Sequence, residues 1–354
     1  MRIALLGVGL IGGSVGLAAR ERLGAEVVGH DPSRRALEEA LERGAIDRAT
    51  ATAAEALEGA GACFCCAPVG ELPALVAEAL AAAPEDCVVT DVGSTKRLIA
   101  ASARDERFVG GHPVAGAETA GARHARADLF QGAAWYLTPS ESSSGVLYER
   151  LHRVVTGLGA RPVALDADTH DRLLATVSHL PHVLANVLVS QAADTAVEEG
   201  KALPPAGPSF RDATRVAGAN TGIWTDIYLS NADAIAAEVD EAARRLAGVA
   251  AALRAGEADA IRGWNDAART ARTRLVDADL AAGPVSELTV SVPNRPGIVA
   301  QVALALGRAG VNIADLALAP AADMRSGSIT LWVSGERARE RACELIADLG
   351  YPVS

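Results

Sequence analysis

Over residues 1–165, short β-like runs of hydrophobic residues alternate with longer stretches rich in Ala and Leu. This alternation is typical of βαβ units, whose parallel strands form one sheet with helices on both of its faces. It predicts an α/β fold with a Rossmann-like, doubly wound sheet over residues 1–166. The predicted strands are Arg2–Gly7, Glu26–Asp31, Ala62–Ala67, Cys87–Val92, Phe108–Gly111, Trp135–Thr138 and Pro162–Leu165.

From Asp168 to about Ala282 the strand pattern disappears and long helical patterns take over, with an interruption near Leu203–Pro208. They predict an all-helical domain over residues 167–283. Its helices are rich in Ala and carry apolar residues on more than one face, a pattern that favours burial against a second copy of the chain. We therefore expect a homodimer that is joined through this domain.

After Pro284 the hydrophobic period returns to two, because Leu288, Val290 and Val292 alternate with polar residues. A turn, a helix, two strands and a second helix follow, and this βαββα order with a short final strand is ferredoxin-like. The sequence predicts a small α+β domain over residues 284–354. The segments expected after the first strand are the turn Pro293–Gly297, a helix to Ala309, strands Val311–Leu318 and Ser328–Val333, and the helix Glu336–Leu349.

The net charge of −11 argues against a nucleic-acid surface and against an anionic membrane partner. No apolar run reaches the roughly 18 residues that a membrane-spanning helix needs. The start, Met1–Leu6, has the pattern of a strand that leads into glycines and not that of a cleavable leader. We therefore expect a cytoplasmic protein. An acidic chain that binds anionic ligands needs local positive charge, so an Arg or His near a cleft is informative.

The first predicted strand leads directly into a glycine-rich loop, Gly7-Val8-Gly9-Leu10-Ile11-Gly12. Gly7 permits the tight turn, Gly9 lets a pyrophosphate approach the backbone, and Gly12 lets helix and strand pack closely. The helix that begins in this loop presents its N–H groups and dipole to the phosphates. Asp31 ends the second strand, where a carboxylate can accept the ribose hydroxyls. The pattern predicts a dinucleotide site formed by Gly7, Gly9, Leu10, Ile11, Gly12 and Asp31.

The charge of Asp31 favours NAD over NADP, because it would repel a 2′-phosphate. Arg34 and Arg35 follow closely and could bind that phosphate instead. Alternatively, the two arginines form only the solvated start of a helix, and we prefer this interpretation. The sequence predicts NAD as the cofactor.

Ser94 and His112 lie just beyond the carboxyl ends of two successive predicted strands. In a doubly wound sheet those ends line the crevice in which cofactor and substrate meet. A lone histidine is more often structural, but a serine and a histidine at the same edge indicate catalysis. We predict both as catalytic residues.

Several motifs in the same order along the chain resemble the prephenate dehydrogenase family, and the resemblance spans about residues 1–280. They are the loop with Ser94, Gly110-Gly111-His112-Pro113-Val114-Ala115-Gly116, Val177-Ser178-His179-Leu180-Pro181-His182, and Phe210-Arg211-Asp212-Ala213-Thr214-Arg215 followed by Trp224. The resemblance implies oxidative decarboxylation of prephenate to 4-hydroxyphenylpyruvate with NAD as hydride acceptor, in tyrosine biosynthesis.

The resemblance also implies roles for individual residues. His112 resembles the family's base, which takes the proton from the C4 hydroxyl while a hydride leaves C4 for the nicotinamide. Ser94 would bind that hydroxyl and orient His112. Arg215 resembles the arginine that holds a substrate carboxylate. The other substrate-binding residues that it implies are His182, Trp224 and, nearer the cofactor, His179.

Two groups of residues have a metal-binding alternative. Cys63, Cys65 and Cys66 lie in one apolar run but lack CxxC spacing, so we interpret them as buried strand thiols. His179 and His182 are three positions apart on a predicted helix, yet a third ligand is missing. We predict no metal site.

The C-terminal segments Val292–Ile298 and Gly310–Ile313 resemble an ACT domain, a module that commonly binds an amino acid at a strand-to-helix junction and at a dimer interface. The resemblance implies Asn294, Gly297 and Asn312 as regulatory residues and tyrosine as an allosteric effector. The alternative is a domain that only supports oligomerisation.

Three other functions compete with this interpretation. Arogenate dehydrogenase uses the same kind of site on a substrate with an amino group, and the sequence does not separate the two. The β-hydroxyacid dehydrogenases need a lysine in the helical domain, where Lys96 and Lys201 are not suitably placed. A non-catalytic sensor of NAD and an amino acid would have no need for Ser94, His112 and Arg215 together.

Overall fold

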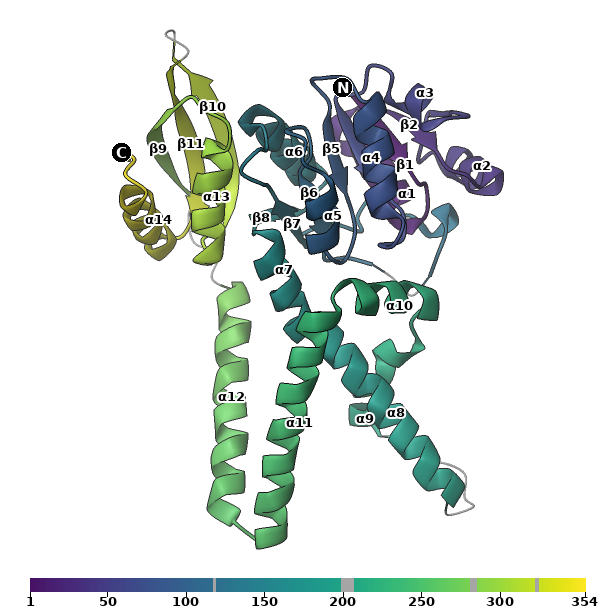
Figure 1. Ribbon diagram of the computed structural model, residues 1–354, viewed down its shortest axis with the longest axis vertical. Helices are drawn as coiled ribbons and strands as arrows, with labels where there is room; N and C mark the ends of the chain where they lie inside the picture. Colours follow the sequence, from purple (N-terminus) through teal and green to yellow (C-terminus); the bar gives the residue numbers. More distant parts are fainter. Residues whose placement is uncertain (117–118, 199–206, 281–284, 322–324) are drawn as a thin grey trace. The chain divides into compact units, whose positions relative to one another are not determined.

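The computed structural model describes residues 1–116, 119–198, 207–280, 285–321 and 325–354 (Figure 1). The chain divides into two compact units. The first unit comprises Met1–Asp171, Gly222–Ser230 and Pro284–Ser354, and the second comprises Arg172–Thr221 and Asn231–Gly283. We describe each unit by itself. The predicted interruption near Leu203–Pro208 and the predicted boundary at residues 283–284 lie largely outside the described residues.

The first unit contains a five-stranded parallel sheet in the order β3-β2-β1-β4-β5. The strand order reverses between β1 and β4, and such a switch point opens a crevice at the carboxyl ends of the strands. The Rossmann-like prediction is confirmed. The strands are β1 (Arg2–Leu6), β2 (Glu26–His30), β3 (Arg48–Ala49), β4 (Ala62–Cys65) and β5 (Val88–Asp91).

Helices cover both faces of this sheet, as the alternating pattern predicted. Ile3 and Leu5 of β1 belong to one hydrophobic cluster, whereas Ala4 and Leu6 belong to another, and all four are buried. A strand buried on both faces reads as a continuous hydrophobic run, because successive side chains point to opposite faces. The helices of this part are α1 (Leu10–Leu23), α2 (Arg34–Arg43), α3 (Ala53–Leu57), α4 (Leu72–Ala82) and α5 (Arg97–Ser102).

A second, three-stranded sheet follows, with β6 (Gly110–Pro113), β7 (Ala134–Thr138) and β8 (Arg161–Ala164) in that order. The pair β7–β8 is parallel, and α6 (Gly145–Gly157) makes the crossover between its strands. The pair β6–β7 is antiparallel, so the prediction of a wholly parallel sheet was wrong here. The physical reason is the connection: between β6 and β7 the described residues contain only the short helix η1 (Ala122–His124), and antiparallel strands need no crossover helix.

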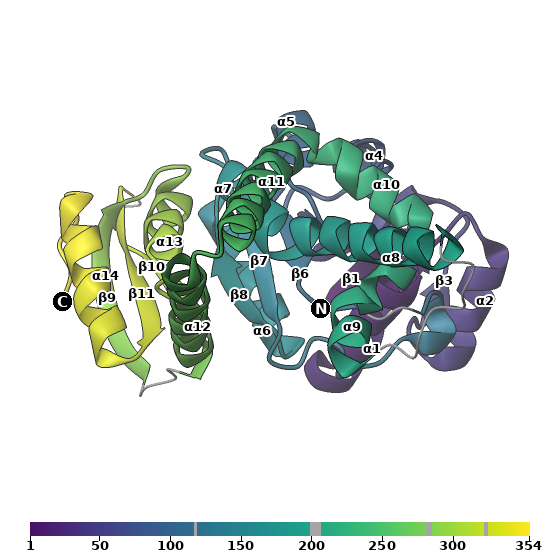
Figure 2. The same cartoon turned by 90° about the horizontal axis from the view of Figure 1, so that it is seen from below.

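The second unit is all-helical in its described residues, as predicted. Figure 1 shows α11 (Ala232–Ala255) and α12 (Ala258–Leu280) as an antiparallel pair, which Figure 2 views end-on. Gly256, with φ of 68°, ends α11 and permits the tight turn between the two helices. The other elements of the region are η2 (Ala175–His179), α8 (Leu180–Glu198), α9 (Pro208–Thr214) and η3 (Arg215–Gly218), with α7 (Ala167–Leu174) before them.

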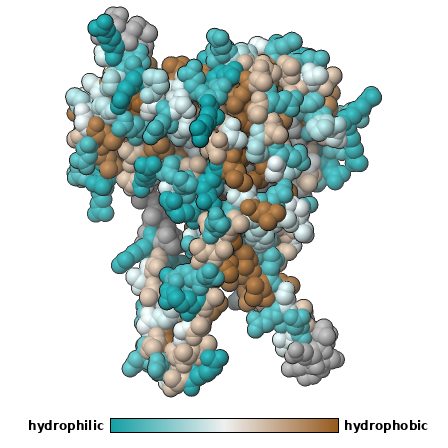
Figure 3. All heavy atoms as spheres, viewed as in Figure 1, coloured by the Kyte–Doolittle hydropathy of each residue, from teal (hydrophilic) through white to brown (hydrophobic). Residues whose placement is uncertain are grey.

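By length and composition, the continuous helix Ala167–Thr195 is long and apolar enough to cross a membrane, judged on its most apolar 18-residue window. The expectation that no segment meets this criterion was wrong, because Ala, Val and Leu outweigh the scattered polar residues on averaging. Only 28% of that window is buried. Figure 3 shows apolar side chains along the exposed flank of the helix. Its most exposed large hydrophobic residues are Val177, Val187, Leu188 and Val189. Core helices of water-soluble proteins pass the same test.

The last 70 or so residues form the predicted βαββα domain. Its strands pair in the antiparallel order β10-β11-β9, and Thr289 and Ser354 exchange two backbone hydrogen bonds of 2.9 Å, which adds the short final strand. The ferredoxin-like prediction is confirmed. The elements are β9 (Val285–Pro293), α13 (Ile298–Arg308), β10 (Ile313–Pro320), β11 (Ser326–Ser334) and α14 (Glu336–Asp348).

This domain packs directly against the part of the first unit that carries α6 and β8. Gly307 of α13 lies so close to the Ala164 carbonyl of β8 that a Cβ atom would not fit there. The Arg308 guanidinium forms an ion pair of 2.9 Å with Asp166, directly after β8. Residues of both α13 and the segment around β8 therefore contribute to this contact.

Candidate active site

The glycine-rich loop has the backbone geometry that its sequence predicted. Gly7 has φ of 99°, and a Cβ atom there would fall on the Cys66 carbonyl. A Cβ atom on Gly12 would fall on the Gly7 carbonyl, whereas one on Gly9 would meet nothing within 4 Å. Gly9 caps α1 without a side-chain hydrogen bond, and Leu10 and Ile11 form its first turn. The helix N-terminus thus has both the space and the donors for a pyrophosphate.

Asp31 lies at the end of β2 beside this loop. Its Oδ2 accepts a hydrogen bond of 3.0 Å from the backbone N–H of Val8, and its Oδ1 accepts one of 2.8 Å from Ser33. Each carboxylate oxygen keeps acceptor capacity for a ribose hydroxyl. The loop and this carboxylate together fit NAD.

Arg34 and Arg35 have the features of a solvated helix start. Their side chains are 92% and 77% exposed, and they pair along the helix surface with Glu38 and Glu39 at 3.1 and 3.0 Å. Such i,i+4 pairs are typical of an exposed helix face. This observation supports the interpretation that we preferred.

The two glycines before His112 let its strand pass unusually close to the end of β5. A Cβ atom on Gly110 would strike the Thr138 hydroxyl, and one on Gly111 would strike the Asp91 carbonyl. The backbone N–H of Gly111 also donates to Asp91 Oδ1 at 3.1 Å. His112 follows them as the third residue of β6, paired with Tyr136 of β7, so the prediction that it lies beyond the end of its strand was wrong. The close approach of its strand to Asp91 holds it near the carboxyl end of β5, and it is only 7% exposed.

His112 is the first member of a buried hydrogen-bonded chain of side chains. Its Nδ1 lies 2.9 Å from Nε2 of His170, and Nδ1 of His170 lies 2.8 Å from Oδ1 of Asp171. Asp171 in turn accepts from the backbone N–H groups of Lys96 at 2.7 Å and Arg97 at 2.9 Å. Burial lowers the pKa of His170, against the opposing effect of its bond to Asp171.

A buried ion pair joins Lys96 to Asp91 underneath this chain. Burial lowers the pKa of the Lys96 ammonium, although Asp91 acts to raise it. Asp91 also accepts from the backbone N–H of Gly93 at 2.8 Å. The pair therefore fixes the loop that carries Ser94, which is half-buried.

The loop after β5 also contacts α10 (Thr221–Ser230), whose residues from Gly222 belong to the first unit. Thr95 donates a hydrogen bond of 2.9 Å to the Ser230 hydroxyl. Trp224 on the same helix is half-buried, and its ring packs against Tyr228 with centroids 5.6 Å apart. The structure thus places Ser94, His112 and Trp224 in one unit.

The other predicted substrate residues lie in the helical unit. His179 is buried in η2, with its Nδ1 3.3 Å from Nδ2 of Asn231. His182 is buried near the start of α8, with its Nδ1 3.3 Å from Nδ2 of Asn186, and burial lowers its pKa. Arg215 is exposed and begins η3.

Sequence reasoning missed four residues of this site: Asp91, Lys96, His170 and Asp171. The signal for the last two was an adjacent His-Asp pair within α7, the helix that follows β8. Nothing local links that pair to His112, which is 58 positions away.

Cys63 and Cys65 are buried strand thiols of β4, as we interpreted them, whereas Cys66 follows the strand and is only partly buried. Cys63 and Cys65 are fully buried, and the pKa of Cys63 is raised well above its usual value by its hydrogen bond to Cys65 and by burial. Burial likewise raises the pKa of Cys66. Within the described residues, no group of three or more His, Cys, Asp or Glu side chains is arranged to hold a metal ion.

Comparison with known proteins places the chain in a family. The model of the prephenate dehydrogenase nucleotide-binding domain matches residues 15–164, and that of the prephenate dehydrogenase dimerization domain matches residues 166–265. A prephenate dehydrogenase of Bacillus subtilis is 29% identical over 97% of this chain and 95% of its own length.

Two solved structures are also similar to this chain. Prephenate dehydrogenase from A. aeolicus, in complex with hydroxyphenyl propionate and NAD+, is 25% identical with a TM-score of 0.73, over 78% of this chain and 98% of its own. Synechocystis arogenate dehydrogenase is 26% identical with a TM-score of 0.68, over 78% of this chain and 100% of its own.

A dinucleotide loop, an acidic residue after β2 and a buried histidine at the carboxyl edge of the sheet define an NAD-dependent dehydrogenase. The two matched domains span more than half of the sequence. The chain belongs to the prephenate dehydrogenase family.

Proposed function

We propose that this enzyme oxidises and decarboxylates prephenate to 4-hydroxyphenylpyruvate, with NAD as hydride acceptor, in tyrosine biosynthesis. The observation that carries the proposal is His112. It is the third residue of β6 and is nearly buried, and its Nδ1 is held by His170. We propose its other ring nitrogen, Nε2, as the atom that takes the substrate proton.

The chemistry needs a base, a hydride acceptor and cationic anchors. NAD, when bound, accepts the hydride from C4 of the ring. His112 takes the proton of the C4 hydroxyl, and Ser94 donates or accepts a hydrogen bond that orients this hydroxyl. The electron pair of the breaking bond to the ring carboxylate then completes the aromatic ring, and carbon dioxide leaves. The C4 oxygen becomes a phenolate and takes a proton back from His112.

The proposal also assigns substrate contacts to individual residues. Arg215 binds a substrate carboxylate, for which the net charge of −11 makes a local cation necessary. His179, His182 and Trp224 are the other substrate-binding residues that we propose. Burial keeps His182 neutral, which suits a hydrogen-bonding role better than that of a permanent charge.

Arogenate dehydrogenase is the second candidate. The observation in its favour is that an arogenate dehydrogenase and a prephenate dehydrogenase resemble this chain to a similar degree, with TM-scores of 0.68 and 0.73. The side chain of arogenate carries an ammonium group in place of the keto group. A non-catalytic sensor is disfavoured, since it would not need a buried, hydrogen-bonded His112.

We predict NADH formation from prephenate with a kcat/KM for NAD at least roughly tenfold above that for NADP. The repulsion between Asp31 and a 2′-phosphate then exceeds about 1.4 kcal/mol. The measurement is initial rates of cofactor reduction with prephenate and arogenate, each with both cofactors. Arg34→Gln is the matched control and should change neither value, because this arginine is solvent-exposed. A preference for NADP that is lost in Arg34→Gln would contradict the prediction.

The homodimer and the cytoplasmic location also remain proposals. The helical domain matches a dimerization domain, and the helix Ala167–Thr195 exposes apolar residues that a second copy would cover. We propose that dimers form through this domain.

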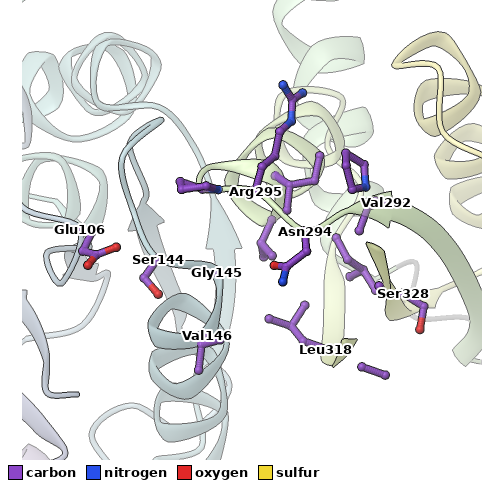
Figure 4. A pocket seen from close by; sticks show the side chains of 16 residues that line it. Glu106, Ser144, Gly145, Val146, Val292, Asn294, Arg295, Leu318 and Ser328 are labelled. Atoms are coloured by element: carbon purple, nitrogen blue, oxygen red, sulfur yellow. The ribbon is translucent and has the colours of Figure 1, made fainter. Parts of the chain in front are cut away.

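A pocket of about 310 Å³ supports the proposed regulation by tyrosine. It lies between the ferredoxin-like domain and the start of α6, and Figure 4 shows the side chains that surround it. Asn294 and Arg295 line it from one domain, and Glu106 and Ser144 from the other. Gly297, with φ of 78°, caps α13 and packs on the Glu141 carbonyl. Asn312 does not line this pocket.

The polar groups of this pocket match an amino acid. Ser144 is the N-cap of α6, and the N-terminus of α13 faces the same region, so a carboxylate finds backbone donors there. Glu106 offers an acceptor for the ammonium group, and the apolar lining includes Ile298 and Leu318. We propose that tyrosine binds here and inhibits the enzyme as an allosteric effector.

Asn294→Leu should therefore raise the tyrosine concentration that gives half-inhibition by about tenfold or more, because it removes a polar contact of roughly 1.4 kcal/mol or more. The measurement is inhibition of NADH formation by tyrosine at several prephenate concentrations. Ser291→Ala, on β9 outside the pocket, is the control. Deletion of residues 285–354 provides a second test. Inhibition that persists unchanged in Asn294→Leu and in the truncated enzyme would mean that tyrosine competes at the active site instead.

A further inference from the structure

The partners of His112 form a chain whose far end is fixed by the backbone. His170 and Asp171 are both fully buried. Asp171 Oδ1 accepts from His170 Nδ1 and from the Lys96 backbone N–H, while its Oδ2 accepts from the Arg97 backbone N–H. Two backbone donors at the start of α5 thus hold this carboxylate in one orientation, and they favour its charged form.

The position of each proton along the chain follows from that carboxylate. A charged Asp171 only accepts, so the Nδ1 of His170 must carry the hydrogen. A neutral His170 then has a lone pair on Nε2, which can only accept from His112. The hydrogen of neutral His112 is therefore on Nδ1, and its Nε2 is free of hydrogen.

We infer that His170, held by Asp171, is a positioning residue that fixes the tautomer and the ring orientation of His112. The inference rests on the proposed role of His112 as base. It adds that an Asp-His-His chain, and not Ser94 alone, prepares Nε2 of His112 to receive the substrate proton. The same chain stabilises the imidazolium that forms, because Asp171 places a negative charge behind it.

The groups around His170 agree with this assignment. Lys96 and Asp91 oppose each other as a buried ion pair, and the Arg97 guanidinium lies 3.4 Å from Asp171 Oδ2. The Tyr136 ring packs edge-on against His170, with centroids 5.3 Å apart. The pKa of Asp171 is lowered, because hydrogen bonds from His170 and the backbone outweigh the effect of burial. Asp171 therefore stays charged and His170 neutral near pH 7.

His170→Leu tests the inference. We expect kcat to fall about 10- to 100-fold, less than for loss of the base itself. The Kd for NAD should stay within about twofold. The rising limb of the kcat/KM against pH profile should move to lower pH, because the His112 imidazolium loses its acceptor and its pKa falls. His170→Gln, whose amide oxygen can accept from His112, should recover part of the lost activity.

A matched control is His152→Leu, since His152 is also buried but lies on α6 outside this site. It should leave kcat and the rising limb unchanged. A His170→Leu enzyme whose rising limb does not move, whatever its kcat, would overturn the inference and leave His170 a packing residue. If His112→Asn keeps normal turnover, the proposed function fails at its base. If His170→Leu keeps normal turnover while His112→Asn loses it, the inference fails and the proposed function stands.

A measurement on the unaltered enzyme covers the case in which His170→Leu does not fold. The ring nitrogens of ¹⁵N-histidine report directly which nitrogen carries hydrogen. The His112 signals are identified as those that vanish in His112→Asn. We expect a protonated Nδ1 and an unprotonated Nε2 for neutral His112. The opposite tautomer would overturn the inference.

Discussion

His112→Asn is expected to lower kcat by about 10²- to 10⁴-fold, the usual contribution of a general base. Asparagine keeps a hydrogen-bonding group at this position but cannot take the proton of the C4 hydroxyl. The Kd for NAD should change little, because the dinucleotide loop lies on β1 and α1 and makes no use of His112. The measurement is the rate of NADH formation at saturating prephenate, with NAD binding followed by fluorescence.

The pH profile separates loss of the base from general damage. In the unaltered enzyme kcat/KM should rise with pH as His112 loses its proton. In His112→Asn this limb should be absent, and the residual rate should not depend on His112 titration. His152→Asn, a substitution of the same kind at a buried histidine of α6, should keep both the rate and the limb. Near-normal turnover of His112→Asn across neutral pH would remove His112 from the mechanism.

Local patterns were sufficient for most of the fold. The alternation of apolar runs and Ala-rich stretches predicted the parallel sheet, because a strand buried on both faces cannot alternate in polarity. The strand β3, which has only two residues, lacks enough length to show such a pattern. The antiparallel pairing of β6 and β7 was missed for another reason. The direction in which strands pair depends on the path of the chain between them, and the sequence of β6 does not record it.

The candidate site likewise contains residues that local patterns predict and residues that only tertiary packing brings together. Gly7, Gly9, Gly12 and Asp31 belong to one βαβ unit, whose spacing fixes their geometry, so the sequence could predict them. The place of His112 at the end of a predicted strand likewise indicated that it is a site residue. The contact between His112 and His170 could not be predicted, because the two residues are 58 positions apart and only tertiary packing brings them together. Asp91 and Lys96 are similar: a buried ion pair cannot be told from two surface charges in the sequence.

The helical domain shows a third kind of limit. Its type was predicted from periodicity, but the apolar length of Ala167–Thr195 was not recognised, because no single run in it is uninterrupted. The averaged hydropathy of a helix depends on where it begins and ends. The sequence also contains no criterion to decide which of its residues would face a second copy of the chain in the proposed dimer.

Arg215→Ala is expected to raise the KM for prephenate by roughly 10- to 150-fold, because a charge-assisted hydrogen bond to a carboxylate contributes about 1.5–3 kcal/mol. The effect on kcat should be much smaller, since the contact exists in the ground state and in the transition state alike. Arg215→Lys should recover part of the affinity, because it keeps the charge but not the planar, two-pronged geometry of the guanidinium.

Arg211→Ala is the matched control for this prediction. Arg211 is an exposed arginine of α9, four positions before Arg215, and has no proposed substrate contact. If the net charge of the region were enough to attract the dianionic substrate, both variants would raise KM equally, and the effect would decrease with added salt. A specific contact instead predicts a large change in KM for Arg215→Ala alone, which persists at high ionic strength. Unchanged KM together with a lower unfolding temperature in Arg215→Ala would show that this arginine stabilises the fold and does not bind the substrate.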